Sequence, residues 1–344
     1  MRYSTVGEVA EKLFLNLAAH ARPGHEPESW EEVAAIGLDC LLLPEEAGGA
    51  GDAFDEACMV MEAFGRHGLC LPLLESMVAN WLLAHSGHEI RSGAKAIALP
   101  IGGPTIRLRN DRTVEIAGSA AVVSSAMTKT LVVLAEDSSG ALYAGVAAVP
   151  DHAMHGTSFA EEPVLLLPSG GITLLEPPRQ IRRPVQMVRG LAPMLQAAAI
   201  GGAISRASEL SLDYANQRQQ FGRPIAAYQA IQHMAAQMAG EGALSAVGVE
   251  LAARKACSDK ALWYAAVAKA TASKAAGTVA ANAHQIHGAI GFTREYALHR
   301  FTLRLWDWRE RYGHEDYWNA QLGRSVLASG PEQLWPSIYG GQAV

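Results

Sequence analysis

Apolar residues in the first part of the chain recur every three or four positions, which is the spacing of one buried face of an α-helix. Residues 6–20 show this spacing, and residues 54–66 repeat it. Between them, an apolar run ends in the glycine-rich segment 44–51. No Lys-Ser or Lys-Thr pair follows these glycines, so we interpret them as a turn between helices rather than a phosphate-binding loop. Residues 1–95 are therefore predicted to form an N-terminal helical domain.

The pattern changes after residue 95. Short runs rich in Val, Ile, Leu and Ala, divided by turn residues, are typical of β-strands. These runs are 96–100, 113–116, 121–124, 130–134 and 142–149. Pro177, Pro178 and Pro184 mark the exit from this region. A small β domain is predicted for residues 96–183.

From residue 184 to residue 344 the pattern is helical again and rich in alanine. Four long helices are predicted, over residues 187–216, 228–257, 260–287 and 295–312. Small residues on several faces allow helices to pack closely, as in a bundle that is buried in an oligomer. The predicted fold class is mainly α with a small β domain, in the order helices, β domain, helical bundle.

Composition narrows the function classes. The 344 residues are 49% hydrophobic and 18% charged, and the net charge is −6. This negative charge argues against a nucleic-acid-binding protein, because such a protein needs a basic face. The four cysteines form no CxxC pair and are expected to be free thiols in a reducing compartment. We find no signal-peptide pattern and no uncharged run of membrane-spanning length. A cytoplasmic protein without a membrane partner or metal site is expected.

Residues 217–225 read Gln-Arg-Gln-Gln-Phe-Gly-Arg-Pro-Ile and lie between two of the predicted long helices. An arginine guanidinium can hold a pyrophosphate with two parallel hydrogen bonds, which lysine cannot reproduce. Arg218 is therefore a candidate phosphate ligand. In the alternative interpretation this segment is a helix end, with Phe221 in the core and Gly222 as the stop.

Residues 285–300 form a second motif, Gln-Ile-His-Gly-Ala-Ile-Gly-Phe-Thr-Arg-Glu-Tyr-Ala-Leu-His-Arg. Together the two motifs resemble the Arg-x-x-Phe-Gly…Gln and Gln-x-x-Gly-Gly-x-Gly signatures of the acyl-CoA dehydrogenase family. The resemblance covers nearly the whole chain and implies a shortened middle β-barrel, a C-terminal four-helix bundle and FAD as cofactor. It assigns contacts with FAD to Arg218, Gln220, Phe221, Gln229, Gln285, Ile286, Gly288 and Ala289.

The family gives these contacts distinct roles. Its arginine meets the flavin pyrophosphate and its phenylalanine packs against the dinucleotide, while the glutamine and glycines meet the adenosine-diphosphate moiety of a neighbouring subunit. Ala289 replaces a glycine that lets the backbone approach the ligand. His287 and His299 are expected to pack at helix ends without a catalytic role.

The usual catalytic carboxylate of the family is missing. The reaction removes a proton next to a thioester carbonyl, so a base must lie within hydrogen-bonding reach of that carbon. The two positions at which family members carry this base hold Tyr312 and Ala192. A tyrosine with a pKa near 10 is a poor base at neutral pH. Glu310, Glu315 and Asp316 remain as relocated candidates, although a solvated, charged helix end is the favoured explanation of these acids.

The β domain departs from the family as well. A Thr-Glu-Pro-x-Ala-Gly-Ser-Asp loop normally touches the flavin ring and the substrate, but residues 98–105 here contain neither an acid nor a serine. Ser124 and Ser125 match the polar positions of the next strand pair, beside the flavin ring. The adenosine-diphosphate side of the cofactor site is thus retained, and the ring, substrate and base side is lost.

This combination resembles the non-catalytic chain of the α2β2 acyl-CoA dehydrogenases that degrade steroid side chains. The resemblance implies a homologous partner subunit, an acyl-CoA substrate oxidised to a trans-2-enoyl-CoA, and an electron-transfer flavoprotein as electron acceptor. Two alternatives stay open: a self-sufficient homotetramer with a relocated carboxylate, and a flavin-free structural subunit.

Overall fold

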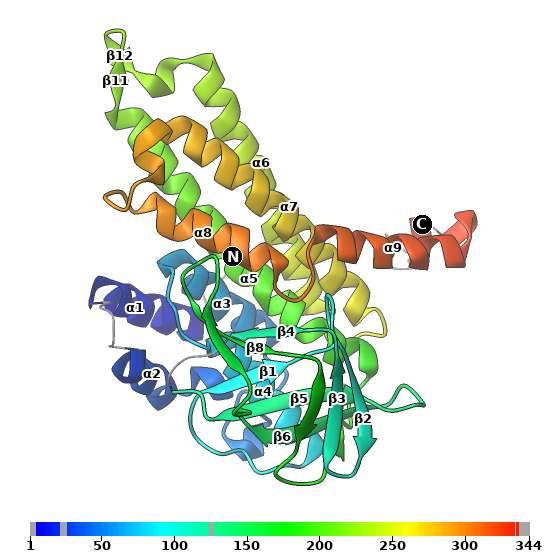
Figure 1. Ribbon diagram of the computed structural model, residues 1–344. Helices are drawn as coiled ribbons and strands as arrows, with labels where there is room; N and C mark the ends of the chain where they lie inside the picture. The colour runs from blue at the N-terminus through cyan, green and yellow to red at the C-terminus, as the bar shows by residue number, and fades with distance from the viewer. Residues whose placement is uncertain (1–4, 21–25, 124–126, 334, 337–344) are drawn as a thin grey trace.

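The computed structural model describes residues 5–20, 26–123, 127–333 and 335–336. Figure 1 shows helices at both ends of the chain and a sheet region between them. The N-terminal helices are α1 (Thr5–His20), α2 (Glu26–Ala35), α3 (Phe54–His67) and α4 (Leu73–Ser86). The glycine-rich segment 44–51 contains a short 3-10 helix, Glu45–Ala47, and connects the preceding 3-10 helix, Leu38–Cys40, to α3, in agreement with the predicted turn between helices.

The middle region consists of two sheets. Its strands are β1 (Lys95–Ala98), β2 (Thr105–Asn110), β3 (Thr113–Ala117), β4 (Ala120–Val123), β5 (Thr130–Glu136), β6 (Leu142–Ala148), β7 (Met154–Thr157), β8 (Pro163–Leu167), β9 (Gly170–Thr173) and β10 (Arg179–Gln180). The larger sheet has the order β10-β6-β5-β2-β3-β9, with β1 parallel to β5, and the smaller has the order β4-β8-β7. Alternate residues of β3, such as Val114 and Ile116, point into an apolar core that the two sheets share.

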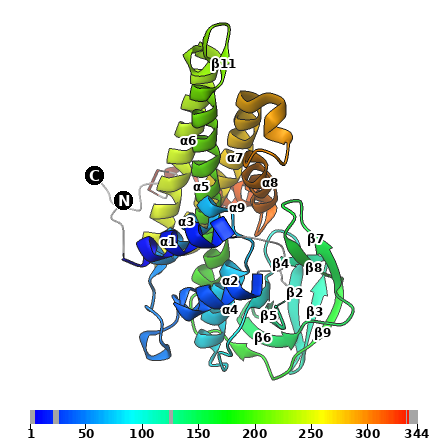
Figure 2. The same cartoon turned by 90° about the vertical axis from the view of Figure 1, so that its left-hand side faces the viewer.

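The C-terminal region is a bundle of long helices. These are α5 (Val185–Gln217), α6 (Gln229–Arg254), α7 (Ala261–His287), α8 (Leu298–Glu310) and α9 (Glu315–Ser329). A two-stranded hairpin, β11 (Gln219–Gln220) and β12 (Arg223–Pro224), joins α5 to α6 at the far end of the bundle (Figures 1 and 2). The fold class predicted from the sequence is confirmed.

Helix α5 is the centre of the molecule. Its residues contribute to one apolar core with both the N-terminal helices and the rest of the bundle. It is long and apolar enough to span a membrane, but 89% of its most apolar window is buried inside the protein, as expected of a core helix. Helix α3 crosses it backbone to backbone: a Cβ on Gly202 would lie 1.8 Å from the Glu62 carbonyl oxygen, and one on Gly65 would lie 1.9 Å from the Ala199 carbonyl oxygen. Only glycine permits this crossing.

One predicted helix differs from the structure. The helix expected over residues 295–312 covers only Leu298–Glu310. Tyr312 has a φ of 55° and therefore lies in the left-handed region, outside any helix. The chain then starts α9, which was not among the predicted helices. This break positions Tyr312 as described below.

Candidate functional site

The first motif forms a rigid hairpin at the tip of the bundle. Phe221 and Gly222 have φ values of 51° and 80°, the two left-handed positions of a type I′ turn, which suits the twist of a two-residue hairpin. The Tyr228 hydroxyl donates a hydrogen bond to the Gln220 carbonyl at 3.0 Å. The Arg223 guanidinium stacks over the Tyr228 ring, 4.3 Å from its centroid. The backbone of the motif is thus fixed before any ligand binds.

This hairpin presents its functional side chains to solvent. Phe221 is 92% exposed, so the interpretation that places it in the core is wrong. Arg218, Gln220 and Gln229 are exposed too. Within the described part of the chain, the Arg218 side chain has no ion pair or hydrogen bond. An exposed phenylalanine held in a left-handed conformation costs about 1–2 kcal/mol, which is unexpected unless a ligand or partner covers it.

The second motif lies where α7 ends. Gly288 has a φ of 63° and turns the chain into the 3-10 helix η4 (Gly288–Phe292). Gln285, Gly288 and Ala289 line an open cavity of about 730 Å³. Ile286 is only 4% exposed and packs in the core, so only its backbone can face a ligand.

Aromatic and polar groups complete this cavity. Phe159, Phe292 and Trp306 supply flat apolar surface, and Arg294 supplies a cation. The His284 ring stacks on Phe292 with centroids 4.1 Å apart. Its Nδ1 is buried and has no hydrogen-bond partner among the described residues. The cavity thus combines stacking surfaces with a cationic side chain, which is typical of a ligand site.

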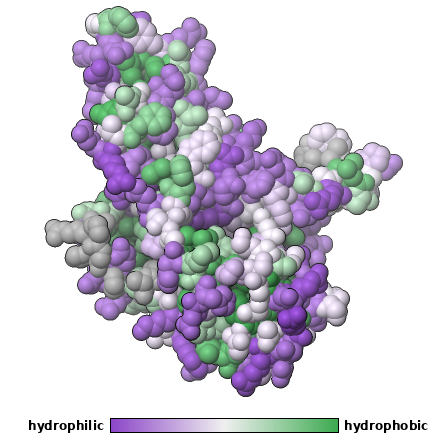
Figure 3. Space-filling model, viewed as in Figure 1, coloured by the Kyte–Doolittle hydropathy of each residue, from purple (hydrophilic) through white to green (hydrophobic). Residues whose placement is uncertain are grey.

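The two motifs share one end of the bundle without sharing a cavity. Tyr214, in the last turn of α5, stacks on His287 of α7 with centroids 4.5 Å apart, and this contact joins the two helix ends. The hairpin residues do not line the cavity beside Gln285. In Figure 3 apolar side chains gather on this arm of the molecule. Both motifs therefore face outward as parts of one end of the bundle.

Tyr312, at the position where the family carries its base, is hydrogen-bonded to a carboxylate in the protein interior. The Tyr312 hydroxyl donates to Glu75 Oε1 at 2.9 Å, across 237 residues of sequence. Glu75, on α4, is 3% exposed, and burial raises its pKa to about 7 although Arg311 opposes the shift. Burial and the Glu75 charge raise the pKa of Tyr312 well above its usual range. Tyr312 therefore stays protonated at neutral pH and cannot act as the base.

The turn that carries Tyr312 is clamped on several sides. A Cβ on Gly102 would lie 2.8 Å from the Gly313 nitrogen, so the loop that replaces the ring-contacting segment packs directly on this turn. The Trp318 indole donates to the Tyr312 carbonyl at 3.0 Å. Lys269, fully buried, donates to the Gly313 and Arg309 carbonyls at 2.8 Å each. No relocation of this turn is possible without breaking these contacts.

The relocated carboxylate candidates are engaged elsewhere. Glu315 forms an ion pair with Arg309, and the Glu310 side chain is 62% exposed. Asp316 is exposed in the first turn of α9. Ala192 is 1% exposed within α5 and has no side chain for acid–base chemistry. Ser124 and Ser125 lie outside the described residues.

A buried ion cluster, which the sequence analysis missed, fastens the β domain to α8. Glu162, between β7 and β8, is 4% exposed and pairs with Arg304 at 3.1 Å and Arg311 at 2.6 Å. The Trp308 indole also donates to Glu162 at 3.3 Å. Burial alone would raise the pKa of Glu162, but the two arginines more than offset it and hold this pKa below its usual range. Arg311 of this cluster directly precedes Tyr312 in the sequence. The cluster holds the β domain against the C-terminal bundle.

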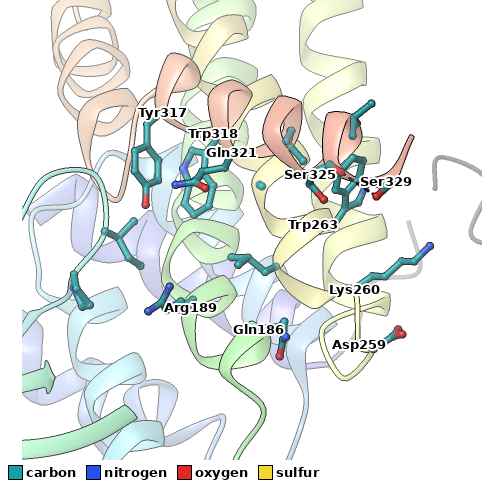
Figure 4. A pocket seen from close by; sticks show the side chains of 16 residues that line it. Gln186, Arg189, Asp259, Lys260, Trp263, Tyr317, Trp318, Gln321, Ser325 and Ser329 are labelled. Carbon is teal, nitrogen blue, oxygen red and sulfur yellow. Dashed lines mark hydrogen bonds between the residues drawn. The ribbon is translucent and has the colours of Figure 1, made fainter. Parts of the chain in front are cut away.

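A second cavity, of about 420 Å³, opens between the β domain and α9 (Figure 4). Trp263 and Trp318 line it from α7 and α9, and Pro100 and Ile101 reach it from the loop after β1. Neither Tyr312 nor Glu75 lines this cavity. Arg189 at its wall is held by Glu136 at 2.9 Å.

Comparisons with known proteins agree with this architecture. The description "Acyl-CoA dehydrogenase, N-terminal domain" matches residues 1–91, and "Acyl-CoA dehydrogenase, C-terminal domain" matches residues 191–306. The chain belongs to the acyl-CoA dehydrogenase family. Members of this family are oxidoreductases that act on CH–CH bonds.

Relatives within the acyl-CoA dehydrogenase family match the chain over almost its full length. The acyl-CoA dehydrogenase IpdE2 of Mycobacterium tuberculosis is 26% identical over 345 residues, which cover 97% of this chain and 95% of IpdE2. A variant of the Tcur3481-Tcur3483 steroid ACAD has a TM-score of 0.79 at 24% identity, covering 94% of this chain and 97% of that chain. The ChsE4-ChsE5 complex of Mycobacterium tuberculosis has a TM-score of 0.77 at 20% identity, covering 95% of this chain and 97% of the matched chain. The structural likenesses show the shared fold.

Two described features of the chain suit the pyrophosphate and adenine parts of a flavin adenine dinucleotide. Exposed Arg218 can meet a pyrophosphate, and the cavity beside Gln285 offers stacking surface for an adenine.

Proposed function

We propose that this chain is the base-lacking subunit of a heteromeric, FAD-dependent acyl-CoA dehydrogenase of the cytoplasm. The observation that supports the proposal is the hydrogen bond from the Tyr312 hydroxyl to buried Glu75, which leaves a protonated tyrosine where the family carries its base. Solved complexes with this fold carry names of two different chains, ChsE4-ChsE5 and Tcur3481-Tcur3483, which supports a heteromer. A homologous subunit would supply the base, the flavin-ring pocket and the acyl-CoA site.

In this proposal the chain contributes to FAD across the subunit interface. Arg218 would hold the pyrophosphate with its guanidinium fork, and Phe221 would cover the dinucleotide, both positioned by the hairpin. Gln220 and Gln229 would donate amide hydrogen bonds from the same tip. The second motif would hold the adenosine-diphosphate end through Gln285 and the backbone of the segment Ile286, Gly288 and Ala289.

The chemistry would proceed in the partner. FAD, where bound, would supply the hydride acceptor for oxidation of an acyl-CoA thioester, and an electron-transfer flavoprotein would take up the electrons. This chain would exclude water from the phosphate end of the cofactor and would fix the orientation of the cofactor. Such positioning supplies a large part of the catalytic effect in cofactor enzymes. No proton would move through Tyr312 or Glu75, because neither lines an open cavity described above.

The test is the flavin content of the assembled complex. Arg218→Ala should weaken FAD binding about 10–100-fold, since hydrogen bonds to charged groups contribute about 1.5–3 kcal/mol. Arg324→Ala is the matched control, because this exposed arginine on α9 also lacks an ion pair among the described residues. Unchanged flavin content in the Arg218 variant, with the complex intact, would show that the hairpin does not hold FAD.

A further inference from the structure

The hairpin at the tip of the bundle carries a second arginine, Arg223, to which the proposed function gives no role. Arg223 lies on β12, directly opposite Gln220 of β11. Its side chain is exposed and forms no ion pair with any described residue. Its guanidinium nevertheless has a fixed place, over the ring of Tyr228. An unpaired cation held beside the candidate phosphate ligand Arg218 is suited to bind an anion.

The register of the hairpin places the two arginines on one face. The ladder pairs Gln220 with Arg223 and continues to Arg218, whose carbonyl accepts the Ile225 N–H at 2.8 Å. Alternate residues of a strand point to the same face, and so do residues directly opposite each other. Arg218, Gln220 and Arg223 therefore share a face. Arg218 and Arg223 are diagonal neighbours on it, about 7–8 Å apart, which is within the reach of long side chains.

This face carries two positive charges without a countercharge. Residues 214–240 contain neither aspartate nor glutamate. Neither Arg218 nor Arg223 has an ion pair in the part of the chain that the structure describes, and both are exposed. Two guanidinium groups on one face repel each other unless an anion lies between them. A diphosphate answers both charges, because each phosphate can accept two hydrogen bonds from one guanidinium.

Tyr228 holds Arg223 ready for such a contact. The Arg223 guanidinium lies 4.3 Å from the centroid of the Tyr228 ring, and the Tyr228 hydroxyl donates to the Gln220 carbonyl at 3.0 Å. An arginine that stacks on an aromatic face keeps the N–H groups of its edge free to donate. A stacked side chain also loses less rotamer entropy when it binds a ligand than a freely moving one does.

We propose that Arg223 is a second phosphate ligand, so that Arg218 and Arg223 each hold one phosphate of the same diphosphate. This inference rests on the proposed function, because the diphosphate is that of FAD bound across the subunit interface. It adds the requirement for a second guanidinium on the same face of the hairpin, positioned by Tyr228.

The test is the FAD affinity of the complex formed with a homologous acyl-CoA dehydrogenase subunit. The complex is stripped of flavin, and FAD is titrated back at low and at high potassium chloride while flavin fluorescence is followed. Arg223→Gln should raise the dissociation constant for FAD about 10-fold or more at low salt. The difference from the natural complex should shrink at high salt, because ions screen the phosphate contact. Arg324→Gln, at an exposed arginine of α9, is the matched control and should leave the affinity unchanged.

A purely structural role of Arg223, as the cation that holds Tyr228 and the hairpin in place, gives a different result. Tyr228→Leu removes the ring beneath Arg223 but keeps its charge, so the salt dependence of FAD binding should stay as in the natural complex. Arg223→Lys also keeps the charge but lacks the fork, so it should recover only part of the affinity. If Tyr228→Leu reduced both the affinity and its salt dependence as much as Arg223→Gln, the proposal would be overturned.

Failure of this inference can be told apart from failure of the proposed function, because Arg218→Ala is measured in the same assay. An affinity that falls in the Arg218 variant but stays unchanged in Arg223→Gln refutes the second phosphate contact and leaves the flavin role of the hairpin in place. An affinity unchanged in both variants, with the complex intact, refutes both.

Discussion

The buried carboxylate of Glu75 makes the stability of this protein depend on pH in a defined direction. Its pKa rises from an ordinary 4.5 to about 7 because burial disfavours the charged form. The folded protein therefore binds one more proton than the unfolded chain between these two pH values. Stability from this group is fully present below pH 4.5 and is lost as pH rises through about 7.

The size of the effect follows from the same shift. At about 1.4 kcal/mol per pH unit, the displacement from 4.5 to about 7 corresponds to about 3 kcal/mol. Glu75→Gln keeps the shape and can still accept the Tyr312 hydroxyl, but it cannot ionise. The variant should therefore gain stability relative to the natural protein as pH rises from 5 to 8, by up to about 3 kcal/mol.

Urea unfolding at pH 5, 6, 7 and 8 measures this difference. The quantity of interest is the change in free energy of unfolding between natural protein and variant at each pH. Glu115→Gln, on the solvent side of β3, is the control and should leave the pH dependence unaltered. A difference in free energy of unfolding that stays constant from pH 5 to pH 8 would show that the pKa of Glu75 is not raised. The account of the Tyr312–Glu75 pair at the base position would then fail.

Other predictions follow from contacts at the same site and core. Lys269→Met leaves the Arg309 and Gly313 carbonyls without their buried donor and should lower the free energy of unfolding by about 2–4 kcal/mol, as measured by urea denaturation. Glu162→Gln removes the countercharge of Arg304 and Arg311. The variant should lower the free energy of unfolding by about 3–5 kcal/mol at neutral pH. The pKa of Glu162 is lowered, so the stabilisation from its charge is lost as pH falls below the ordinary pKa of a glutamate. The difference between natural protein and variant should therefore shrink in acid. A difference that stays constant with pH would refute the pairing. Gly202→Ala forces α3 and α5 apart and should prevent accumulation of folded protein on expression, and normal yield would show that the helices do not cross backbone to backbone.

Much of the fold could be predicted because its signals are local. Helical periodicity located α5, α6 and α7 within a few residues, and turn residues separated the early strands of the β domain. The flavin-type motifs have fixed spacing within one segment, so Arg218 and Gln285 could be selected from sequence. Their exposure at one end of the bundle is a result of the structure.

The rest depends on contacts between distant parts of the chain. Glu75 meets Tyr312 over 237 residues, and the sequence around Glu75 is an ordinary apolar helix. Lys269 lies in an alanine-rich helix that also carries the exposed Lys274, and no local pattern distinguishes the buried lysine from the exposed one. Nor does any local pattern predict that Glu162 will bridge Arg304 of α8 and Arg311 just after this helix. Such pairings become visible only when tertiary structure brings the groups together.

The most direct test of the proposed role is the visible spectrum of the purified chain, alone and then co-expressed with a homologous acyl-CoA dehydrogenase subunit, with acyl-CoA turnover measured on both samples. Oxidised flavin absorbs at about 370 and 450 nm, and it carries the redox chemistry of this reaction class. The account predicts a colourless, inactive chain and a yellow, active complex. A yellow chain that oxidises acyl-CoA by itself would contradict it.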